Sequence, residues 1–134
     1  MTEKGYAVIT GASSGIGAAT AQALAAEGFR VIATARRADL LNELASASPL
    51  IEVLEIDVTS QDDIDRLDQY LADKDVTVLF ANAGGAFDAK PIAQADIAAW
   101  EKTYEVNVVG LVRTVKMCVP HLVKSQRGTI VLTG

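Results

Sequence analysis

A short β-branched run near the amino terminus leads into a glycine-rich turn, and the turn opens a helical segment. Tyr6–Thr10 is typical of a buried strand, and TGASSGIG over residues 10–17 follows it. Glycines let backbone N–H groups approach an anion closely, and the amino end of a helix adds a favourable dipole. The spacing Gly11-x-x-x-Gly15-x-Gly17 lacks the lysine that a P-loop needs after its last glycine. The stretch predicts a phosphate-binding turn; the alternative is a strand–helix turn without a ligand.

The rest of the chain alternates between short apolar runs and helical segments. The expected strands are nearly continuous in hydrophobicity, as strands covered on both faces should be, and comprise Tyr6–Thr10, Arg30–Ala35, Ile51–Ile56, Val76–Ala81 and Thr129–Leu132. The expected helices lie between them, at Ile16–Glu27, Asp39–Ser46, Asp62–Asp73 and from about Asp96 to Lys124. This alternation predicts one α/β domain over residues 1–134, with a doubly wound parallel sheet and right-handed crossovers.

Local signals indicate where several helices begin, bend or end. Gly28 stands where a C-cap glycine belongs. Ser60-Gln61-Asp62-Asp63 resembles a capping box, with Asp63 in place of the usual glutamate. Pro120 is expected to kink or end the last helix. Apolar residues at three- and four-residue spacing predict the buried face of that helix: Val108, Leu111, Val112, Val115 and Val119.

Composition argues against several classes of function. The 134 residues carry 17 acidic and 12 basic side chains, a net charge of −5, whereas nucleic-acid binding needs a dense basic surface. We expect no membrane partner because no 18-residue apolar run is apparent, and no secretory signal because no basic segment leads into an apolar one. Cys118 is the only cysteine, which excludes an intrachain disulfide and suits a cytoplasmic protein. With one cysteine and one histidine, His121, no metal site is expected.

Three further stretches complete a recognisable pattern. Asp57-Val58 follows the third expected strand, Asn82-Ala83-Gly84 follows the fourth, and Asn107 lies within the long helix. Together with Thr10-Gly11-x-x-x-Gly15-Ile16-Gly17, in this order and spacing, they resemble the short-chain dehydrogenase/reductase family across the whole chain. The resemblance implies a Rossmann-like sheet in the order 3-2-1-4-5, with carboxyl-terminal strands and helices still to follow. It also implies a nicotinamide cofactor, a small alcohol or carbonyl substrate, and a homodimer or homotetramer.

The family pattern implies roles for individual residues. The glycine-rich turn, with Thr10, Ser13, Ser14 and Ile16, is expected to bind the cofactor. Asp57 would hydrogen-bond the adenine, with Val58 beside it; the alternative for Asp57 is a helix-capping carboxylate. Asn82, Ala83 and Gly84 would line the cofactor, although small residues are also common in ordinary loops. Asn107 is the one catalytic residue expected here, holding a water in the proton relay to the active-site lysine. Its alternative is a partly exposed or kink-forming asparagine.

Two arginines at the end of the second strand favour NADP over NAD. In dinucleotide-binding folds an acidic residue at this position binds the adenosine ribose diol, whereas arginine accommodates a 2′-phosphate. Here Arg36 and Arg37 follow Ala35, with no carboxylate at that strand end. A guanidinium can pair with the phosphate through two hydrogen bonds, and Ser13 and Ser14 could add hydroxyl donors.

The catalytic serine and the Tyr-x-x-x-Lys pair of the family are expected beyond Gly134. Tyr6, Tyr70 and Tyr104 are not expected to supply that pair. One interpretation is therefore the amino-terminal part of an NADP-dependent oxidoreductase that interconverts an alcohol and a carbonyl and is inactive as residues 1–134. Residues 81–110, with Trp100, loosely resemble members acting on 3-hydroxy acids such as serine. The alternative is a non-catalytic nucleotide-binding or regulatory module.

Overall fold

The computed structural model describes residues 4–13 and 15–134, so Ser14 lies outside the described residues. The strands of that part are β1 (Tyr6–Ile9), β2 (Arg30–Ala35), β3 (Ile51–Glu55), β4 (Val76–Ala81) and β5 (Thr129–Leu132). Its α-helices are α1 (Gly15–Ala26), α2 (Asn42–Ala47), α3 (Gln61–Tyr70), α4 (Ile97–Tyr104) and α5 (Gly110–Ser125). Short 3₁₀ turns at Ala38–Leu41 and Ile92–Gln94 precede α2 and α4, and a π-helical segment, Glu105–Val109, joins α4 to α5.

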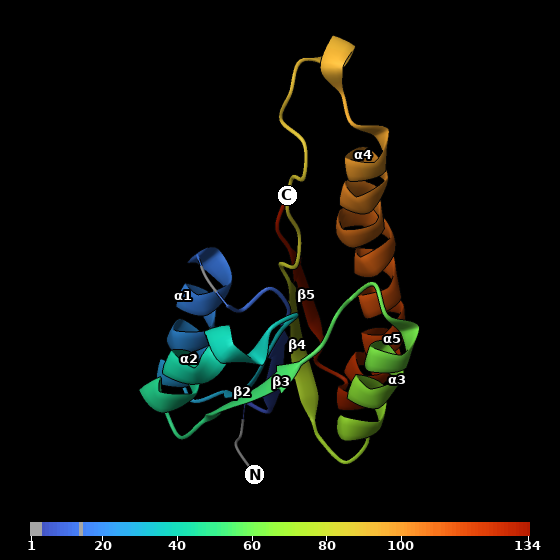
Figure 1. The fold of residues 1–134 in the computed structure, drawn as a ribbon. Coiled ribbons are helices and arrows are strands. Elements are labelled where there is room, and N and C mark those ends of the chain that lie inside the picture. Colours follow the sequence, from blue (N-terminus) through green and yellow to red (C-terminus); the bar gives the residue numbers. More distant parts are fainter. Residues whose placement is uncertain (1–3, 14) are drawn as a thin grey trace.

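The sheet is parallel throughout and has the strand order β3-β2-β1-β4-β5, which confirms the predicted fold class and order. Helices α1 and α2 cover one face, and α3 and α5 cover the other (Figure 1). The strand order reverses between β1 and β4. Ligands of open α/β sheets bind at the carboxyl ends of the strands beside such a reversal, so the fold directs attention to that edge.

Each face of the sheet buries its own apolar cluster. Ile9 belongs to the cluster under α1 and α2, whereas its neighbour Val8 belongs to the cluster under α3 and α5. Both side chains are fully buried. Successive side chains of a strand point to opposite faces, so a strand covered on both sides is apolar at every position. This explains why the strands are recognisable as continuous apolar runs.

The predicted helix-end signals at Gly28 and Ser60 are confirmed. Gly28 has φ +96° and its N–H donates to the carbonyl of Ala25 at the end of α1. The Ser60 hydroxyl accepts from the N–H of Asp63 over 3.2 Å and caps α3. The Asp63 carboxylate reaches past Ser60 and accepts from the N–H of Asp57 over 2.8 Å. In a capping box this carboxylate would accept from the Ser60 N–H, which here donates to the Asp57 carbonyl over 2.9 Å instead. The Asp63 carboxylate therefore fixes the turn that carries Asp57.

Pro120 does not end the last helix, so that part of the prediction is wrong, whereas a kink at Pro120 stays a prediction. It lies inside α5, which continues to Ser125 and ends at Gln126 in the left-handed conformation, φ 63°. A proline removes the hydrogen bond to the carbonyl four residues earlier, here that of Lys116. Lys116 and Pro120 are both exposed, so water can satisfy the freed carbonyl.

The predicted buried face of the last helix is only partly right. Leu111 and Val115 are partly buried and pack against the apolar cluster under α3 and α5. Val108, Val112 and Val119 are exposed by 40%, 59% and 39%. The face against the sheet is formed by smaller or softer side chains: Gly110, Thr114, Met117, Cys118 and Leu122. Two sides of α5 are apolar, and spacing alone does not say which of them the sheet covers.

By length and composition alone, the helix over Ile97–Ser125 could cross a membrane, which corrects the expectation that no such segment exists. The helix meets the criterion because only Arg113 and Lys116 interrupt its apolar stretch over residues 106–123. In this structure its α5 part covers one face of the sheet (Figure 1), and core helices of globular proteins meet the same criterion.

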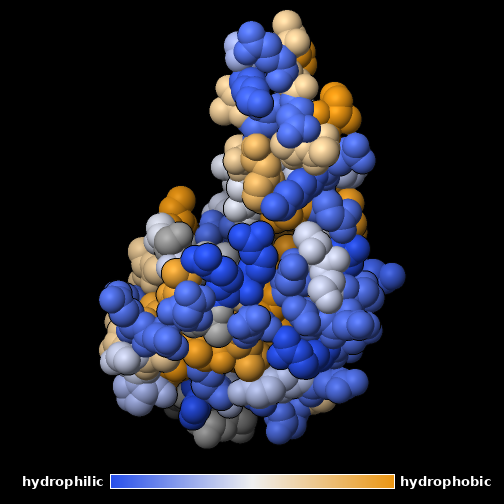
Figure 2. Space-filling model, in the orientation of Figure 1, coloured by the Kyte–Doolittle hydropathy of each residue, from blue (hydrophilic) through white to orange (hydrophobic). Residues whose placement is uncertain are grey.

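Beyond the sheet, the segment after β4 and the start of α4 stand out from the body of the molecule. Figure 2 shows hydrophobic side chains among hydrophilic ones on this projection. Ile92 and Ile97 are 80% and 67% exposed there. Trp100 and Tyr104 are also more than half exposed. At the sheet edge, β5 is exposed along its whole length.

Candidate functional site

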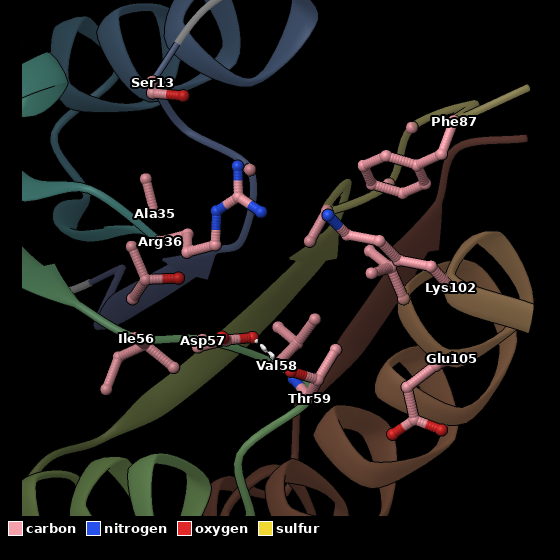
Figure 3. A pocket seen from close by; sticks show the side chains of 16 residues that line it. Ser13, Ala35, Arg36, Ile56, Asp57, Val58, Thr59, Phe87, Lys102 and Glu105 are labelled. Carbon is pink, nitrogen blue, oxygen red and sulfur yellow. Dashed lines mark hydrogen bonds between the residues drawn. The ribbon is translucent and has the colours of Figure 1, made fainter. Parts of the chain in front are cut away.

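A cleft of about 570 Å³ opens at the carboxyl ends of β1, β2, β3 and β4 (Figure 3). It lies at the reversal of strand order, where the fold predicts a ligand. Its walls combine small residues, apolar side chains and a few charged groups. They are formed by Gly11, Ser13, Thr34, Ala35, Arg36, Ile56, Asp57, Val58, Thr59, Ala83, Gly84, Gly85, Phe87, Lys102, Glu105 and Val106.

The glycine-rich turn forms one end of the cleft through Gly11 and Ser13. Gly11 has φ +63°, and a Cβ there would come within 2.8 Å of the carbonyl oxygen of Asn82. A Cβ at Gly17 would overlap the carbonyl oxygen of Gly11. Gly15 has φ +59° with open space around it. Gly11 and Gly17 therefore let neighbouring stretches of backbone pack closely together. At Gly15, glycine is favoured because the backbone has a positive φ.

Behind the turn, Thr10 and Asn82 brace β1 against β4. The Thr10 hydroxyl accepts from the N–H groups of Asn82 and Ala83 over 2.9 and 3.0 Å. The Asn82 side chain donates through Nδ2 to the carbonyl of Gly11 over 3.1 Å. Thr10 and Asn82 therefore shape the cleft without lining it.

Asp57 lies at the base of the cleft and is a turn residue, not the cap of a helix. Its Oδ1 accepts from the N–H and the hydroxyl of Thr59 over 2.9 and 2.7 Å (Figure 3). Ser60 caps the next helix, so the helix-capping alternative for Asp57 does not hold. Burial opposes ionisation, but the Thr59 hydrogen bonds and the charges of Arg36 and Arg113 together hold the pKa of Asp57 below its usual value. Asp57 is thus a carboxylate that can accept a hydrogen bond from a ligand.

The structure separates the two adjacent arginines. Arg36 extends from the end of β2 into the cleft, on the same side as Ser13 (Figure 3). Arg37 is absent from the lining; its Nε lies 3.9 Å from Oδ1 of Asp39, with both side chains mostly exposed. Of the two guanidinium groups, only that of Arg36 can contact a ligand in the cleft as it stands.

Asn107 lies in the π-helical segment, beside the cleft. Its Oδ1 accepts from the N–H of Gly85 and its Nδ2 donates to the carbonyl of Gly85, each over 2.8 Å. A Cβ at Gly84 would come within 2.7 Å of Oδ1, so a glycine is needed there. The Asn107 side chain therefore holds the loop after β4 against the π-helical segment, and both ends of its amide already form hydrogen bonds with Gly85. Its predicted role in holding a water stays a prediction.

Several cleft residues escaped the sequence analysis. Thr34, Ala35, Ile56 and Thr59 flank predicted residues at the ends of β2 and β3. Gly85 and Phe87 continue the loop after β4, and Lys102, Glu105 and Val106 face it from α4 and the π-helical segment. The Lys102 ammonium lies 4.5 Å from the centre of the Phe87 ring. Spacing at i, i+3 and i+4 could have placed Lys102, Glu105 and Val106 on one helix face.

The remaining predicted cofactor residues lie outside the lining. These are Thr10, Gly15, Ile16, Gly17, Arg37 and Asn82. Ile16 is 63% exposed at the start of α1, next to the turn. Their roles in cofactor binding stay predictions.

Tyr70 and Lys74 have the Tyr-x-x-x-Lys spacing, which the expectation for the chain's tyrosines overlooked. They lie at the end of α3, near Tyr6 at the amino end of β1 and away from the cleft. The Tyr70 hydroxyl donates to Glu52 over 2.6 Å, which raises its pKa to about 12. The Lys74 ammonium lies 4.1 Å from the Tyr70 ring centre. A general acid at neutral pH needs a lower pKa, so this pair is structural.

His121, the only histidine of the chain, links two helices. Its Nε2 lies 2.6 Å from Oδ1 of Asp68, and its side chain is only 13% exposed. The contact joins α5 to α3, on the face of the sheet opposite to α1 and α2. His121 therefore contributes to packing and not to the cleft.

Comparison with known proteins gives one consistent result. The family model described as short chain dehydrogenase matches residues 5–134. A serine 3-dehydrogenase of Agrobacterium fabrum is 35% identical over 130 residues, covering 95% of this chain and 52% of the relative. An uncharacterized oxidoreductase of Mycobacterium tuberculosis is 43% identical, covering 97% and 51%.

A solved structure agrees with these relatives. The closed form of a serine dehydrogenase complexed with NADP+ matches with a TM-score of 0.89 and 29% identity, covering 96% of this chain and 53% of that one. The chain spans about half the length of the curated relatives it matches.

Proposed function

Because the chain belongs to the short-chain dehydrogenase/reductase family, we propose that the intact protein is an NADP-dependent oxidoreductase that interconverts an alcohol and a carbonyl. The observation that carries the proposal is the cleft at the strand-order reversal, with Arg36 and Ser13 at one end and Asp57 at its base. The NADP+ complex of a related serine dehydrogenase supports the choice of cofactor.

The residues of the cleft suit a dinucleotide. Gly11 and Gly17 leave no room for a Cβ because Asn82, Ala83 and the Gly11 carbonyl fill that space, so both glycines keep the turn before α1 tight, and a pyrophosphate would bind at this turn. Arg36 supplies the one guanidinium in the described cleft, and it would pair with the 2′-phosphate of the adenosine ribose. The Asp57 carboxylate would accept from the adenine amino group, and Val58 would pack against the ring. The cleft is thus adapted to the adenosine half of NADP.

When bound, the nicotinamide accepts or donates a hydride, while the alcohol or carbonyl oxygen exchanges a proton with the protein. In this chain, Asn107 would act near that proton path by holding the loop at Gly85 against the π-helical segment. A disordered loop would misplace the dinucleotide relative to the substrate, and small displacements of this kind lower rates strongly. Residues beyond Gly134 would supply the acid–base group itself.

For the substrate, we propose a 3-hydroxy acid such as serine, or the corresponding 3-oxo acid in the reverse direction. The proposal is supported by the serine 3-dehydrogenase of Agrobacterium fabrum, whose similarity covers 95% of this chain. A carboxylate substrate also needs a cationic partner. Activity on 3-hydroxy acids tests the substrate class.

A non-catalytic nucleotide-binding module is the alternative, and activity measurements separate the two. We expect residues 1–134 alone to show no hydride transfer, because the family's acid–base tyrosine is expected outside them and a positioned acid contributes roughly 10²–10⁴-fold. The protein expressed from the complete reading frame should reduce NADP+ with serine or another 3-hydroxy acid. Absorbance at the NADPH band measures both. Turnover by purified 1–134, or none by the complete protein on any alcohol, would contradict the proposal.

The exposed side of α4 and α5 supports a homodimer or homotetramer. Large apolar residues recur along it at intervals of one or two helical turns, and each is at least 39% exposed: Trp100, Tyr104, Val108, Val112, Val119 and Val123. Contiguous apolar surface of this kind marks interaction sites. We expect the complete protein to be an oligomer by light scattering, and Val112→Glu to shift it toward monomer. A monomeric wild type would contradict this.

A further inference from the structure

The end of β5 is fastened to the turn after β4 by a side-chain hydrogen bond. Thr133 follows β5, and its hydroxyl donates to Oδ1 of Asn82 over 2.7 Å. Its N–H also donates to the carbonyl of Ala81 over 3.3 Å. The side chains of Thr133 and Asn82 are partly buried, although β5 itself is exposed. The contact joins residues 51 positions apart in the chain.

The Asn82 amide is held from both ends. Thr133 donates to its oxygen, while its Nδ2 donates to the carbonyl of Gly11 over 3.1 Å. A reversed amide would place its oxygen against the Gly11 carbonyl, which is unfavourable because both are acceptors. The chain of contacts therefore runs from β5 through Asn82 to the glycine-rich turn.

The surroundings of Asn82 leave little room for another arrangement. A Cβ at Gly17 would come within 2.8 Å of Nδ2, and a Cβ at Gly11 within 2.8 Å of the Asn82 carbonyl oxygen. Gly11 lines the cleft and holds a left-handed conformation, φ +63°. A shift of the Asn82 amide would move the backbone of Gly11, so its orientation bears on the shape of the ligand site.

We propose that Thr133 is a positioning residue for the cofactor cleft, acting through Asn82 to hold the Gly11 turn in the shape that binds the dinucleotide. The inference rests on the proposed function for the identity of the ligand. It adds a residue from β5, a strand that contributes nothing to the cleft lining. It also makes the glycine-rich turn sensitive to the position of β5.

The test is a set of variants of the protein expressed from its complete reading frame, with NADPH binding measured by titration calorimetry. Thr133→Val keeps the side-chain shape and removes the donor, so we expect roughly two- to tenfold weaker binding at unchanged stoichiometry. Thr133→Ser keeps the hydroxyl and should bind within about twofold of the wild type. Thr129→Val makes the same change at the exposed start of β5 and serves as the matched control.

A double-mutant cycle with Asn82 separates positioning from general destabilisation. If Thr133 acts through Asn82, Thr133→Val should have little further effect in an Asn82→Ala background. Equal losses in both backgrounds would overturn the proposal, as would a Thr133→Val protein that binds NADPH like the wild type. A loss of stoichiometry without a change in affinity would also overturn it, because that result means partial unfolding.

Hydrogen exchange distinguishes failure of this inference from failure of the proposed function. If the wild type binds neither NADPH nor NADH, the proposed cofactor is wrong. The positioning role of Thr133 is then tested by hydrogen exchange of the ligand-free protein. Thr133→Val should then exchange faster than the wild type at residues 11 and 82–85, and Thr133→Ser should not. Unchanged exchange at those residues in Thr133→Val would overturn the positioning role.

Discussion

Arg36→Asp is expected to abolish or invert the preference of the complete protein for NADP over NAD. The Arg36 guanidinium enters the cleft, where a charge-assisted bond to the 2′-phosphate is worth about 1.5–3 kcal/mol. Because 1.4 kcal/mol is tenfold in affinity, the wild type should prefer NADP by roughly ten- to a hundredfold in kcat/KM. Aspartate adds repulsion toward the phosphate and an acceptor for the free ribose hydroxyls.

Arg37→Ala is the matched control for Arg36→Asp, since it changes the neighbouring arginine, which faces Asp39 and not the cleft. We expect it to leave the NADP preference almost unchanged. Values of kcat/KM for both cofactors in the three proteins decide the matter. Equal use of both cofactors by the wild type would refute the 2′-phosphate assignment. A preference that depends on Arg37 would instead show that the side chains rearrange on binding.

Gly17→Ala should strongly weaken cofactor binding and lower the stability of the fold. A Cβ at this position would overlap the carbonyl oxygen of Gly11 and come within 2.8 Å of Nδ2 of Asn82. A backbone oxygen cannot move aside as the end of a flexible side chain can. Overpacking costs typically about 1–3 kcal/mol, so NADPH affinity should fall roughly tenfold to a hundredfold.

Gly15→Ala, two residues earlier, separates a steric requirement from a conformational one. Gly15 has open space around it but φ +59°, so alanine there meets strain of about 1–2 kcal/mol and no clash. We expect Gly15→Ala to lose less affinity and less thermal stability than Gly17→Ala. Calorimetric titration and thermal unfolding of both variants test the order. The reverse order would mean that the turn changes shape when the dinucleotide binds.

The sequence by itself determined the fold and the location of the site. The alternation of apolar runs and helices predicted a parallel doubly wound sheet, and the family pattern supplied its strand order, which is confirmed. Local chemistry also sufficed at Gly28 and Ser60, because caps depend on residues within one turn of chain. The glycine-rich turn and Asp57 come to the same cleft because parallel strands end at the same edge.

Only the tertiary structure decided which faces and which neighbours these residues meet. Arg36 and Arg37 are adjacent and chemically identical, yet Arg36 lines the cleft whereas Arg37 lies beside Asp39. Both sides of α5 are apolar, and the sheet covers the one with Thr114 and Cys118. Periodicity describes the geometry of one element, whereas these outcomes depend on what lies against it.

The contacts that shape the site join residues distant in sequence. Thr133 meets Asn82 across 51 positions, and Asn107 meets Gly85 across 22. The π-helical segment that presents Asn107 has no signature among the residues Glu105–Val109. Conversely, a catalytic spacing in the sequence need not place residues at the site: Tyr70 and Lys74 have that spacing but lie at the opposite end of β1 from the cleft. Spacing specifies neighbours within an element, and the packing of sheet and helices determines which of those residues meet at the site.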